Sequence, residues 1–271
     1  MSTPELDYSM PQKVAFVTGG SYGLGFAIAQ RLASCGYKVV ILARDHAKLE
    51  AAVQELSKAG REATGIACDI ADPEALRDAA QSILERDGHL DFLIANAGSL
   101  HLGILEEHTA ESAIADIEIG LVGTVLTCRA FLPISRSGSK ILFITSGFGL
   151  MGAAGYAPYC AANAGVINFA EALRRELLRR DISVYVACPS DIDTPGHRRE
   201  LEELPPWMNK AGARGEVMNA DVAARRILTQ CRGRRFLIII NREIQLLQIV
   251  KRFFPERALQ FLVDRLFPTP T

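Results

Sequence analysis

The chain has 271 residues, 49% of them hydrophobic and 23% charged, with a formal net charge of −1. This composition is that of a globular protein with a large core. A net charge so near zero argues against a general nucleic-acid-binding protein, which needs a basic surface for phosphates. The longest strongly apolar run, Phe236 to Ile240, is far too short to span a bilayer. The polar segment from Met1 to Gln12 predicts neither a signal nor a transit peptide.

The cysteines and histidines of the chain are scattered. The six cysteines form no CxxC pair and the five histidines no closely spaced pair, so the spacing of a zinc site is absent. We therefore expect reduced thiols, a cytoplasmic protein and no bound metal.

Short apolar runs alternate with helical stretches along most of the chain. Strands are predicted at residues 13–17, 38–43, 63–68, 90–95, 140–145, 183–188 and 235–240, and helices at residues 26–34, 47–58 and 158–179. Asp72 suits a helix N-cap and Pro73 the first helical position, so another helix should follow the third strand. Continuous apolar strands alternating with helices indicate a parallel sheet covered on both faces. The sequence therefore predicts a single doubly wound α/β domain of the Rossmann type, residues 1–241, with a seven-stranded parallel sheet.

A glycine-rich segment, Thr18-Gly19-Gly20-Ser21-Tyr22-Gly23-Leu24-Gly25, joins the first predicted strand to the first predicted helix. A loop that binds phosphate needs glycine where its backbone approaches the ligand, and a helix N-terminus whose free N–H groups attract the anion. The strand–loop–helix context meets both needs, so we expect this segment to bind a dinucleotide. The alternative is a turn with a purely structural role.

The spacing of these glycines, TGxxxGxG, resembles that of classical short-chain dehydrogenases/reductases. Further motifs of that family follow in the same order: Asp69 after the third strand, Asn96-Ala97-Gly98 after the fourth, Ser146 with Tyr159 thirteen residues later, and residues 189–194 after the sixth. The resemblance implies a nicotinamide dinucleotide bound by Thr18, Gly19, Ser21, Tyr22, Gly23, Leu24, Gly25, Arg44, Asp69, Ile70, Asn96, Ala97, Gly98, Tyr159, Asn163, Pro189, Ile192 and Thr194.

A narrower resemblance bears on the substrate. The segment Ser190-Asp191-Ile192-Asp193-Thr194-Pro195-Gly196 is similar to the PDTDTPG segment of 3-ketodihydrosphingosine reductases, and Val40-Ile41-Leu42-Ala43-Arg44 is similar to their second strand. This resemblance implies the reduction of a long-chain sphingoid ketone. The apolar residues at 148, 150, 151 and 204–208 suit such a substrate, although a core or a dimer interface would use the same residue types.

Arg44 bears on the choice of cofactor. An NAD site has an acidic residue near the end of the second strand, where it binds the ribose 2′-hydroxyl. Here Ala43 leaves that position uncharged, and the Arg44 guanidinium can pair with a 2′-phosphate through charge-assisted hydrogen bonds. Asp45 is expected to open the next helix instead. We therefore expect NADP(H), with a solvated surface charge as the alternative interpretation of Arg44.

The catalytic residues that the resemblance implies are Ser146, Tyr159 and Asn163, and they depart from the family pattern. In the family, tyrosine exchanges the proton, serine holds the substrate oxygen, lysine lowers the tyrosine pKa and holds the ribose, and asparagine supports a water in a proton relay. The YxxxK motif reads here as Tyr159-Cys160-Ala161-Ala162-Asn163, and the relay asparagine aligns with Gly120. An amide therefore occupies the lysine position.

Loss of the lysine charge should weaken the site. A unit charge about 4 Å from a phenolate is worth on the order of 4 kcal/mol at an effective dielectric of 20, or roughly 3 pKa units. Without that charge, we expect the pKa of Tyr159 near its ordinary value of about 10. Neutral Tyr159 can still donate a proton in ketone reduction, whereas alcohol oxidation, which needs the phenolate, should suffer more.

A helical extension, residues 242–271, is expected after the domain. It should form two helices at residues 243–254 and 256–267, divided by Pro255, and Leu259, Leu262, Val263 and Leu266 would make one apolar stripe. We expect the extension to pack on its own domain, with a membrane surface or an oligomer contact as alternatives. The predicted helix at residues 158–179 favours a homodimer or homotetramer, because the family pairs such helices.

These features predict an NADP(H)-dependent oxidoreductase that reduces the carbonyl of a hydrophobic small molecule to an alcohol, with 3-ketosphinganine as the best single candidate. The alternative is a dinucleotide-binding protein with little redox activity, either regulatory or catalysing a non-redox step. The departures at Asn163 and Gly120 favour this alternative.

Overall fold

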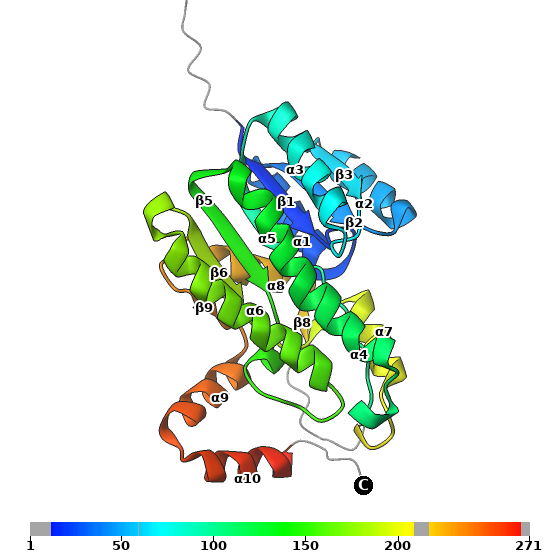
Figure 1. The fold of residues 1–271 in the computed structure, drawn as a ribbon, viewed down its shortest axis with the longest axis vertical. Helices are drawn as coiled ribbons and strands as arrows, with labels where there is room; N and C mark the ends of the chain where they lie inside the picture. The colour runs from blue at the N-terminus through cyan, green and yellow to red at the C-terminus, as the bar shows by residue number, and fades with distance from the viewer. Residues whose placement is uncertain (1–11, 59, 209–216, 267–271) are drawn as a thin grey trace, which may run out of the picture.

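A seven-stranded parallel sheet forms the centre of the computed structural model, which describes residues 12–58, 60–208 and 217–266 (Figure 1). The strands are β1 (Val14–Thr18), β2 (Lys38–Ala43), β3 (Ala63–Ala67), β4 (Leu90–Ala95), β5 (Ser135–Ile144), β6 (Ser183–Ala187) and β9 (Leu237–Ile238). Their order is β3-β2-β1-β4-β5-β6-β9, and neighbouring strands are parallel. The predicted doubly wound α/β fold is confirmed.

The seventh strand is shorter than the sequence suggested. The apolar run predicted a strand over residues 235–240, but β9 contains only Leu237 and Ile238. These two residues pair with Val186 and Ala187, the last two residues of β6. The N–H groups of Val186 and Cys188 donate to the carbonyls of Phe236 and Ile238, so the two strands pair only over this short stretch.

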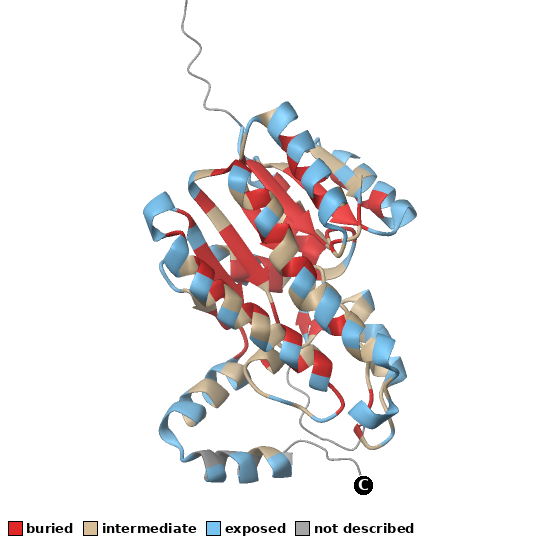
Figure 2. Ribbon diagram, in the orientation of Figure 1, coloured by how far each residue is buried: buried red, intermediate tan, exposed pale blue. Residues whose placement is uncertain are grey.

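Helices cover both faces of the sheet and enclose two apolar cores (Figure 2). One face carries α1 (Gly23–Ser34), α2 (His46–Lys58) and α8 (Ala220–Gln230). The opposite face carries α3 (Pro73–Asp87), α5 (Gly123–Phe131) and α6 (Ala157–Glu176). Alternate strand residues supply the two cores, because successive side chains of a strand point to opposite faces.

Two helix starts have clear local causes. The Asp72 carboxylate accepts hydrogen bonds from the N–H groups of Glu74 and Ala75 at 2.9 and 3.1 Å, so α3 begins at Pro73 as predicted. The helix expected from residue 26 instead begins at Gly23, because the glycines at the end of the glycine-rich segment already form its first turn.

A long helical segment crosses the second face. It consists of α4 (Ala110–Ile117), a π-helical turn (Glu118–Val122) and α5. By length and composition alone, the helical stretch Ala110–Ile134 could cross a membrane, a feature that a search for unbroken apolar runs missed. In the fold, this segment packs against α3, β4 and α6.

The C-terminal extension forms α9 (Arg242–Phe253) and α10 (Glu256–Leu266), close to the predicted boundaries. No residue of α9 is buried, although the Ile244 side chain lies against Gly147 and the Lys251 ammonium donates a hydrogen bond to the Leu150 carbonyl. Of the expected stripe, Val263 is partly buried, and the side chains of Leu259, Leu262 and Leu266 lie outside the described residues.

Candidate active site

The glycine loop leaves room for a ligand against its backbone. Gly19 and Gly23 have φ angles of +63° and +61°, a left-handed conformation that favours glycine. A Cβ on Gly25 would lie 2.3 Å from the Gly19 carbonyl oxygen, so no larger residue fits there. No side chain caps the N-terminus of α1, and its first turn contains no acidic residue. The free N–H groups of that turn therefore fit the phosphates of a dinucleotide.

Thr18 and Asn96 bind each other across the ends of β1 and β4. The Thr18 hydroxyl accepts hydrogen bonds from the N–H groups of Asn96 and Ala97, at 2.9 and 3.1 Å. The Asn96 side-chain amide donates to the carbonyls of Thr18 and Gly19, at 3.0 and 3.2 Å. These residues therefore hold the loops of the expected cofactor site in place.

Two cations lie beside this loop. A guanidinium nitrogen of Arg44 lies 3.7 Å from the Asp69 carboxylate, and the Arg44 side chain is 65% exposed, so a ligand can reach it. The Lys48 ammonium lies 2.8 Å from the Asp45 carboxylate and 5.9 Å from the centre of the Tyr22 ring. Hydrogen bonds from Lys48 lower the pKa of the Asp45 carboxyl, which accepts from the Lys48 N–H near the start of α2, as expected. The sequence analysis missed Lys48, although it follows Arg44 by one helical turn.

The segment after β6 closes against the glycine loop. Ile192 and Asp193 form β7 (Ile192–Asp193), which pairs with β8 (Met218–Asn219). The Thr194 hydroxyl caps α7 (Pro195–Glu203) by accepting from the His197 N–H at 3.1 Å. The Thr194 Cβ lies 3.3 Å from where a Cβ on Gly23 would be, so the structure brings these two predicted site segments together.

The remaining expected cofactor residues differ in exposure. Ile70 is buried, and its side chain occupies the space where a Cβ on Gly123 would lie. Three others are also buried: Ser21, Leu24 and Pro189. Ala97 is partly exposed, and Gly98 is exposed.

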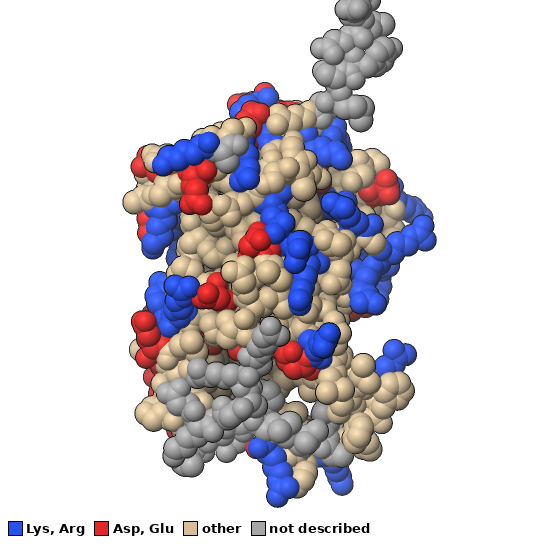
Figure 3. All heavy atoms as spheres, turned by 180° about the vertical axis from the view of Figure 1, so that it is seen from behind, with Lys and Arg blue, Asp and Glu red and all other residues tan. Residues whose placement is uncertain are grey.

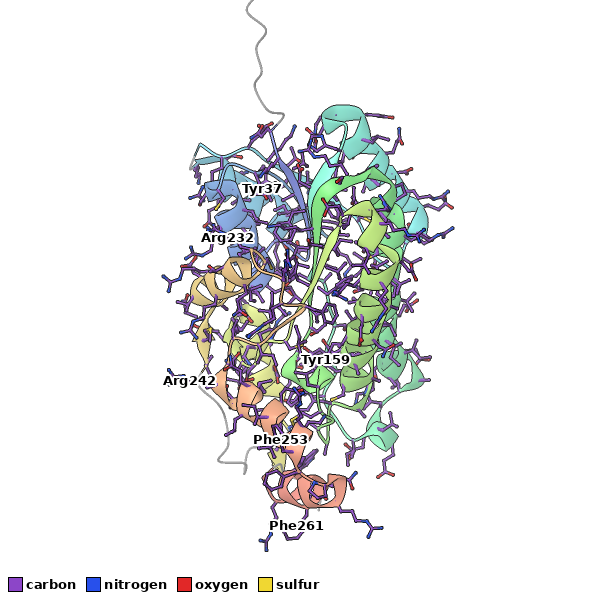
Figure 4. All side chains as sticks on the ribbon, turned by 90° about the vertical axis from the view of Figure 1, so that its left-hand side faces the viewer. Tyr37, Tyr159, Arg232, Arg242, Phe253 and Phe261 are labelled. Atoms are coloured by element: carbon purple, nitrogen blue, oxygen red, sulfur yellow. The ribbon has the colours of Figure 1, made fainter. Side chains whose placement is uncertain are left out.

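The structure brings together the three expected catalytic residues. Tyr159 lies near the start of α6, and two polar side chains act on its hydroxyl: Ser146, which follows β5, and Asn163, one turn along α6. The Asn163 amide nitrogen also donates to the Tyr159 carbonyl at 2.8 Å, so this side chain folds back on its own helix. Figure 4 shows Tyr159 above Phe253 of α9.

The expected pKa of Tyr159 is wrong. Burial of the phenol raises the pKa of Tyr159 to about 12, above the ordinary value of about 10 that the missing lysine suggested. The hydrogen bond with Ser146 lowers the pKa, the Glu200 carboxylate raises it, and the hydrogen bond with Asn163 lowers it. Desolvation prevails because no cation is among the groups that act on the phenol. The Tyr159 phenol is therefore neutral throughout the physiological range.

Gly120 lies within the π-helical turn, beside α6. A Cβ on Gly120 would lie 3.2 Å from the Ala162 Cβ, one residue before Asn163. Its carbonyl accepts a hydrogen bond from the Thr124 hydroxyl at 2.8 Å. π-Turns occur often at functional sites, and this one packs against α6, with no side chain at the position of the expected relay asparagine.

An apolar wall surrounds the Tyr159 side chain. Tyr156, Cys160 and Met208 form its buried part, and the partly buried residues packed against them include Leu100, Leu102, Phe148, Leu204 and Trp207. Most of these residues come from segments far apart in the sequence. Of the apolar residues expected on a substrate side, the structure brings Phe148, Leu204, Trp207 and Met208 to Tyr159, whereas Leu150 packs against one of the cores beside the sheet.

Two polar groups of this region escaped the sequence analysis. The buried Asp116 carboxylate accepts hydrogen bonds from the backbone N–H of His101 at 3.0 Å and lies 2.8 Å from its Nδ1, which fixes the segment between Leu100 and Leu102. On α7, Glu200 accepts a hydrogen bond from the Tyr156 hydroxyl at 2.7 Å. Neither belongs to a short motif: Asp116 lies in a largely apolar stretch, whereas Glu200 is one of several charged residues of α7.

Charges of both signs are interspersed on the face shown in Figure 3. Among the residues that the structure describes, no group of three or more His, Cys, Asp or Glu side chains is arranged to hold a metal ion.

Comparison with known proteins yields consistent matches. Residues 13–204 match the family model of the short chain dehydrogenases. A 3-dehydrosphinganine reductase of Arabidopsis thaliana is 33% identical over 241 residues, which are 87% of this chain and 73% of the relative. A human 3-oxoacyl-[acyl-carrier-protein] reductase is 32% identical over 184 residues, 67% of this chain and 76% of the relative. The structure of a short-chain dehydrogenase from Burkholderia cenocepacia in complex with NADP is 28% identical, with a TM-score of 0.74 over 84% of this chain and 96% of that one.

Proposed function

Because this chain belongs to the short-chain dehydrogenase family, a family of oxidoreductases, we propose that it is an NADP(H)-dependent reductase of hydrophobic ketones. The observation that carries the proposal is the meeting of the Ser146 and Tyr159 hydroxyls beside an apolar wall. The best single candidate substrate is 3-ketosphinganine (3-dehydrosphinganine), since a reductase of that compound is among the relatives and its alkyl chain suits the wall.

The cofactor would be held by the glycine loop and by the segment ending at Thr194, with Arg44 and Lys48 at the 2′-phosphate. The N-terminus of α1 suits the phosphates, and the two cations suit the additional charge that distinguishes NADP(H) from NAD(H). When bound, NADPH supplies the hydride for the carbonyl carbon.

The chain's own residues handle the substrate oxygen. Ser146 donates a hydrogen bond to the carbonyl oxygen, and Tyr159 donates the proton that converts the reduced oxygen to a hydroxyl. Burial keeps the phenol protonated, and no cation is among the described groups that act on it, which suits reduction better than oxidation. Asn163 holds the start of α6 through its bond to the Tyr159 carbonyl and leaves its oxygen for a ribose hydroxyl.

A second candidate function is dinucleotide binding with little redox activity, in a regulatory or non-redox role. Specific observations favour it: Asn163 in the lysine position, Gly120 in the relay position and the raised pKa of Tyr159. These features weaken stabilisation of the negative charge that develops on Tyr159, without removing its proton.

We also propose a cytoplasmic homodimer or homotetramer that rests on membranes through its C-terminal extension, a unit separate from the domain of residues 1–241. Family members are generally oligomeric, and the segment formed by α4 and the π-turn exposes Ile114, Ile117 and Val122. The extension exposes Leu246, Ile249, Phe253, Phe254 and Phe261 (Figure 4). Lys251 and Arg252 lie among these apolar residues, a combination typical of helices that bind anionic membrane surfaces.

Arg44→Ala should reduce the preference for NADPH over NADH. We expect the unmodified protein to bind NADPH at least about tenfold tighter than NADH, and the variant to lose most of that gap, because a charge-assisted contact to the 2′-phosphate is removed. Titration of cofactor fluorescence measures both affinities. Arg77→Ala, an exposed change on α3, is the control, and equal affinities in the unmodified protein would contradict the proposal.

Tyr159→Phe should abolish reduction of 3-ketosphinganine and of simpler ketones, and Asn163→Lys should increase it. Recovery of half of the charge interaction of about 4 kcal/mol corresponds to a rate increase of roughly thirtyfold. The measurement is NADPH oxidation under saturating ketone. Substantial turnover in Tyr159→Phe would refute the assigned proton donor. An Asn163→Lys protein that binds NADPH normally but reduces no ketone would favour the non-redox function.

The raised pKa of Tyr159 predicts the pH dependence. The phenol is the reactive form in reduction, so the rate should be flat from about pH 6 to about pH 9 and fall only as the pH approaches the pKa of about 12. Oxidation of the alcohol needs the phenolate, so its rate should rise about tenfold per pH unit over the same range. Asn163→Lys should move both profiles to lower pH. A reduction rate that falls between about pH 7 and about pH 9 in the unmodified protein would contradict this assignment.

Replacing Phe253 and Phe261 with serine should weaken binding to vesicles that contain anionic lipid, because these two side chains are 76% and 62% exposed on the extension. Sedimentation with vesicles measures the bound fraction. Leu178→Ser removes an apolar residue that is 64% exposed outside the extension and serves as the matched control. Equal binding by all three proteins would exclude the extension as the membrane contact.

A further inference from the structure

Glu200 brings a carboxylate into the apolar wall around Tyr159. One of its oxygens accepts the hydrogen bond from the Tyr156 hydroxyl at 2.7 Å, and the other lies 3.4 Å from Nδ1 of His197. The side chain of Glu200 is only 20% exposed and that of His197 only 10%. Among the described residues, no Lys or Arg side chain pairs with this carboxylate. A carboxylate so far from water needs compensation, because the loss of hydration is costly without a cation.

The bond from Tyr156 alone could be explained as a tie between α7 and the start of α6. His197 goes beyond that explanation, because its Nε2 atom is buried and has no hydrogen-bond partner. When Nδ1 carries the proton shared with Glu200, Nε2 is an acceptor. The Glu200 carboxylate and Nε2 of His197 are then hydrogen-bond acceptors whose missing donor lies outside the described residues.

This cluster adjoins the reacting group. The ring centres of Tyr156 and Tyr159 lie 6.4 Å apart, and the Glu200 charge acts on the Tyr159 phenol. Thr194, the last of the expected cofactor residues, is the N-cap of α7, so Glu200 lies on the helix that follows the expected cofactor site. A donor group bound here would belong to the same molecule whose carbonyl reaches Tyr159.

We propose that Glu200 binds a protonated amine adjacent to the substrate carbonyl, with His197 Nε2 accepting a second hydrogen bond from the same polar end. The site is therefore specific for long-chain α-amino ketones. This proposal rests on ketone reduction at Tyr159, and it makes Glu200 a specificity-determining residue. An ammonium neutralises the carboxylate, whereas a ketone without the amine leaves the carboxylate unpaired. The free-energy cost of that unpaired charge discriminates strongly between the two ketones.

The test compares 3-ketosphinganine with its deaminated analogue of the same chain length. We expect the unmodified protein to favour the amino ketone by about 10- to 100-fold in kcat/KM. Glu200→Gln keeps an acceptor for the Tyr156 hydroxyl but removes the charge. It should erase that preference, while reduction of the deaminated ketone persists or rises, because the variant removes the charge that opposes loss of the Tyr159 proton. Glu202→Gln, an exposed change on the same helix, should retain the preference.

A second readout separates this proposal from the reductase function. Calorimetric titration with sphinganine and with the deaminated diol, in the presence of NADP, should show tighter binding of the amine, and Glu200→Gln should remove the difference. If no ketone is reduced but sphinganine binding depends on Glu200, the reductase function fails and the amine site stands. Equal handling of aminated and deaminated ligands by the unmodified protein, or an equal loss for both in Glu200→Gln, would overturn the amine site.

Discussion

The join between β1 and β4 is the constraint on which the rest of the site depends. The strand order reverses here, so the connections leaving these two strands run to opposite faces of the sheet and open a crevice at their carboxyl ends. Asn96 holds the crevice to a fixed width by donating to the carbonyls of Thr18 and Gly19. A Cβ on Gly19 would lie 2.9 Å from the Asn96 amide nitrogen, so the same join requires glycine in the loop. The shape of the expected cofactor site and the alignment of the strands thus depend on one set of contacts.

Much of this framework could be predicted from the sequence because it is encoded locally. Each signal depends only on residues close together in the sequence: the apolar runs of the strands, the Asp72 cap and the spacing of the glycines. The fold was predicted from these signals. The pKa of Tyr159 could not be predicted in this way. It depends on burial by a wall that includes Leu100 and Trp207, residues far from Tyr159 in the sequence. The meeting of Glu200 with Tyr156, 44 residues apart, depends in the same way on tertiary packing.

The chemistry of Tyr159 reflects two effects with the same direction. Burial disfavours the phenolate, and the Glu200 carboxylate disfavours it further. Asn163 opposes them only with a hydrogen bond, since an amide carries no charge. A phenol with such a raised pKa loses its proton reluctantly. In a reductase, the barrier to proton transfer must therefore be lowered by contacts that strengthen as negative charge builds on the substrate oxygen. The Ser146 hydroxyl is positioned for such a contact.

The charge of the substrate would change this balance. An ammonium bound at Glu200 cancels the carboxylate's effect on the phenol, so the pKa of Tyr159 in the complex should lie below that of the free protein. The apolar wall strengthens this effect, because exclusion of water from the site lowers the local dielectric. An amino ketone would then bring with it part of the positive charge that the chain lacks at Asn163. A ketone without the amine would face a phenol still opposed by an unpaired carboxylate. Selection of the substrate and activation of the proton donor would therefore depend on the same ion pair.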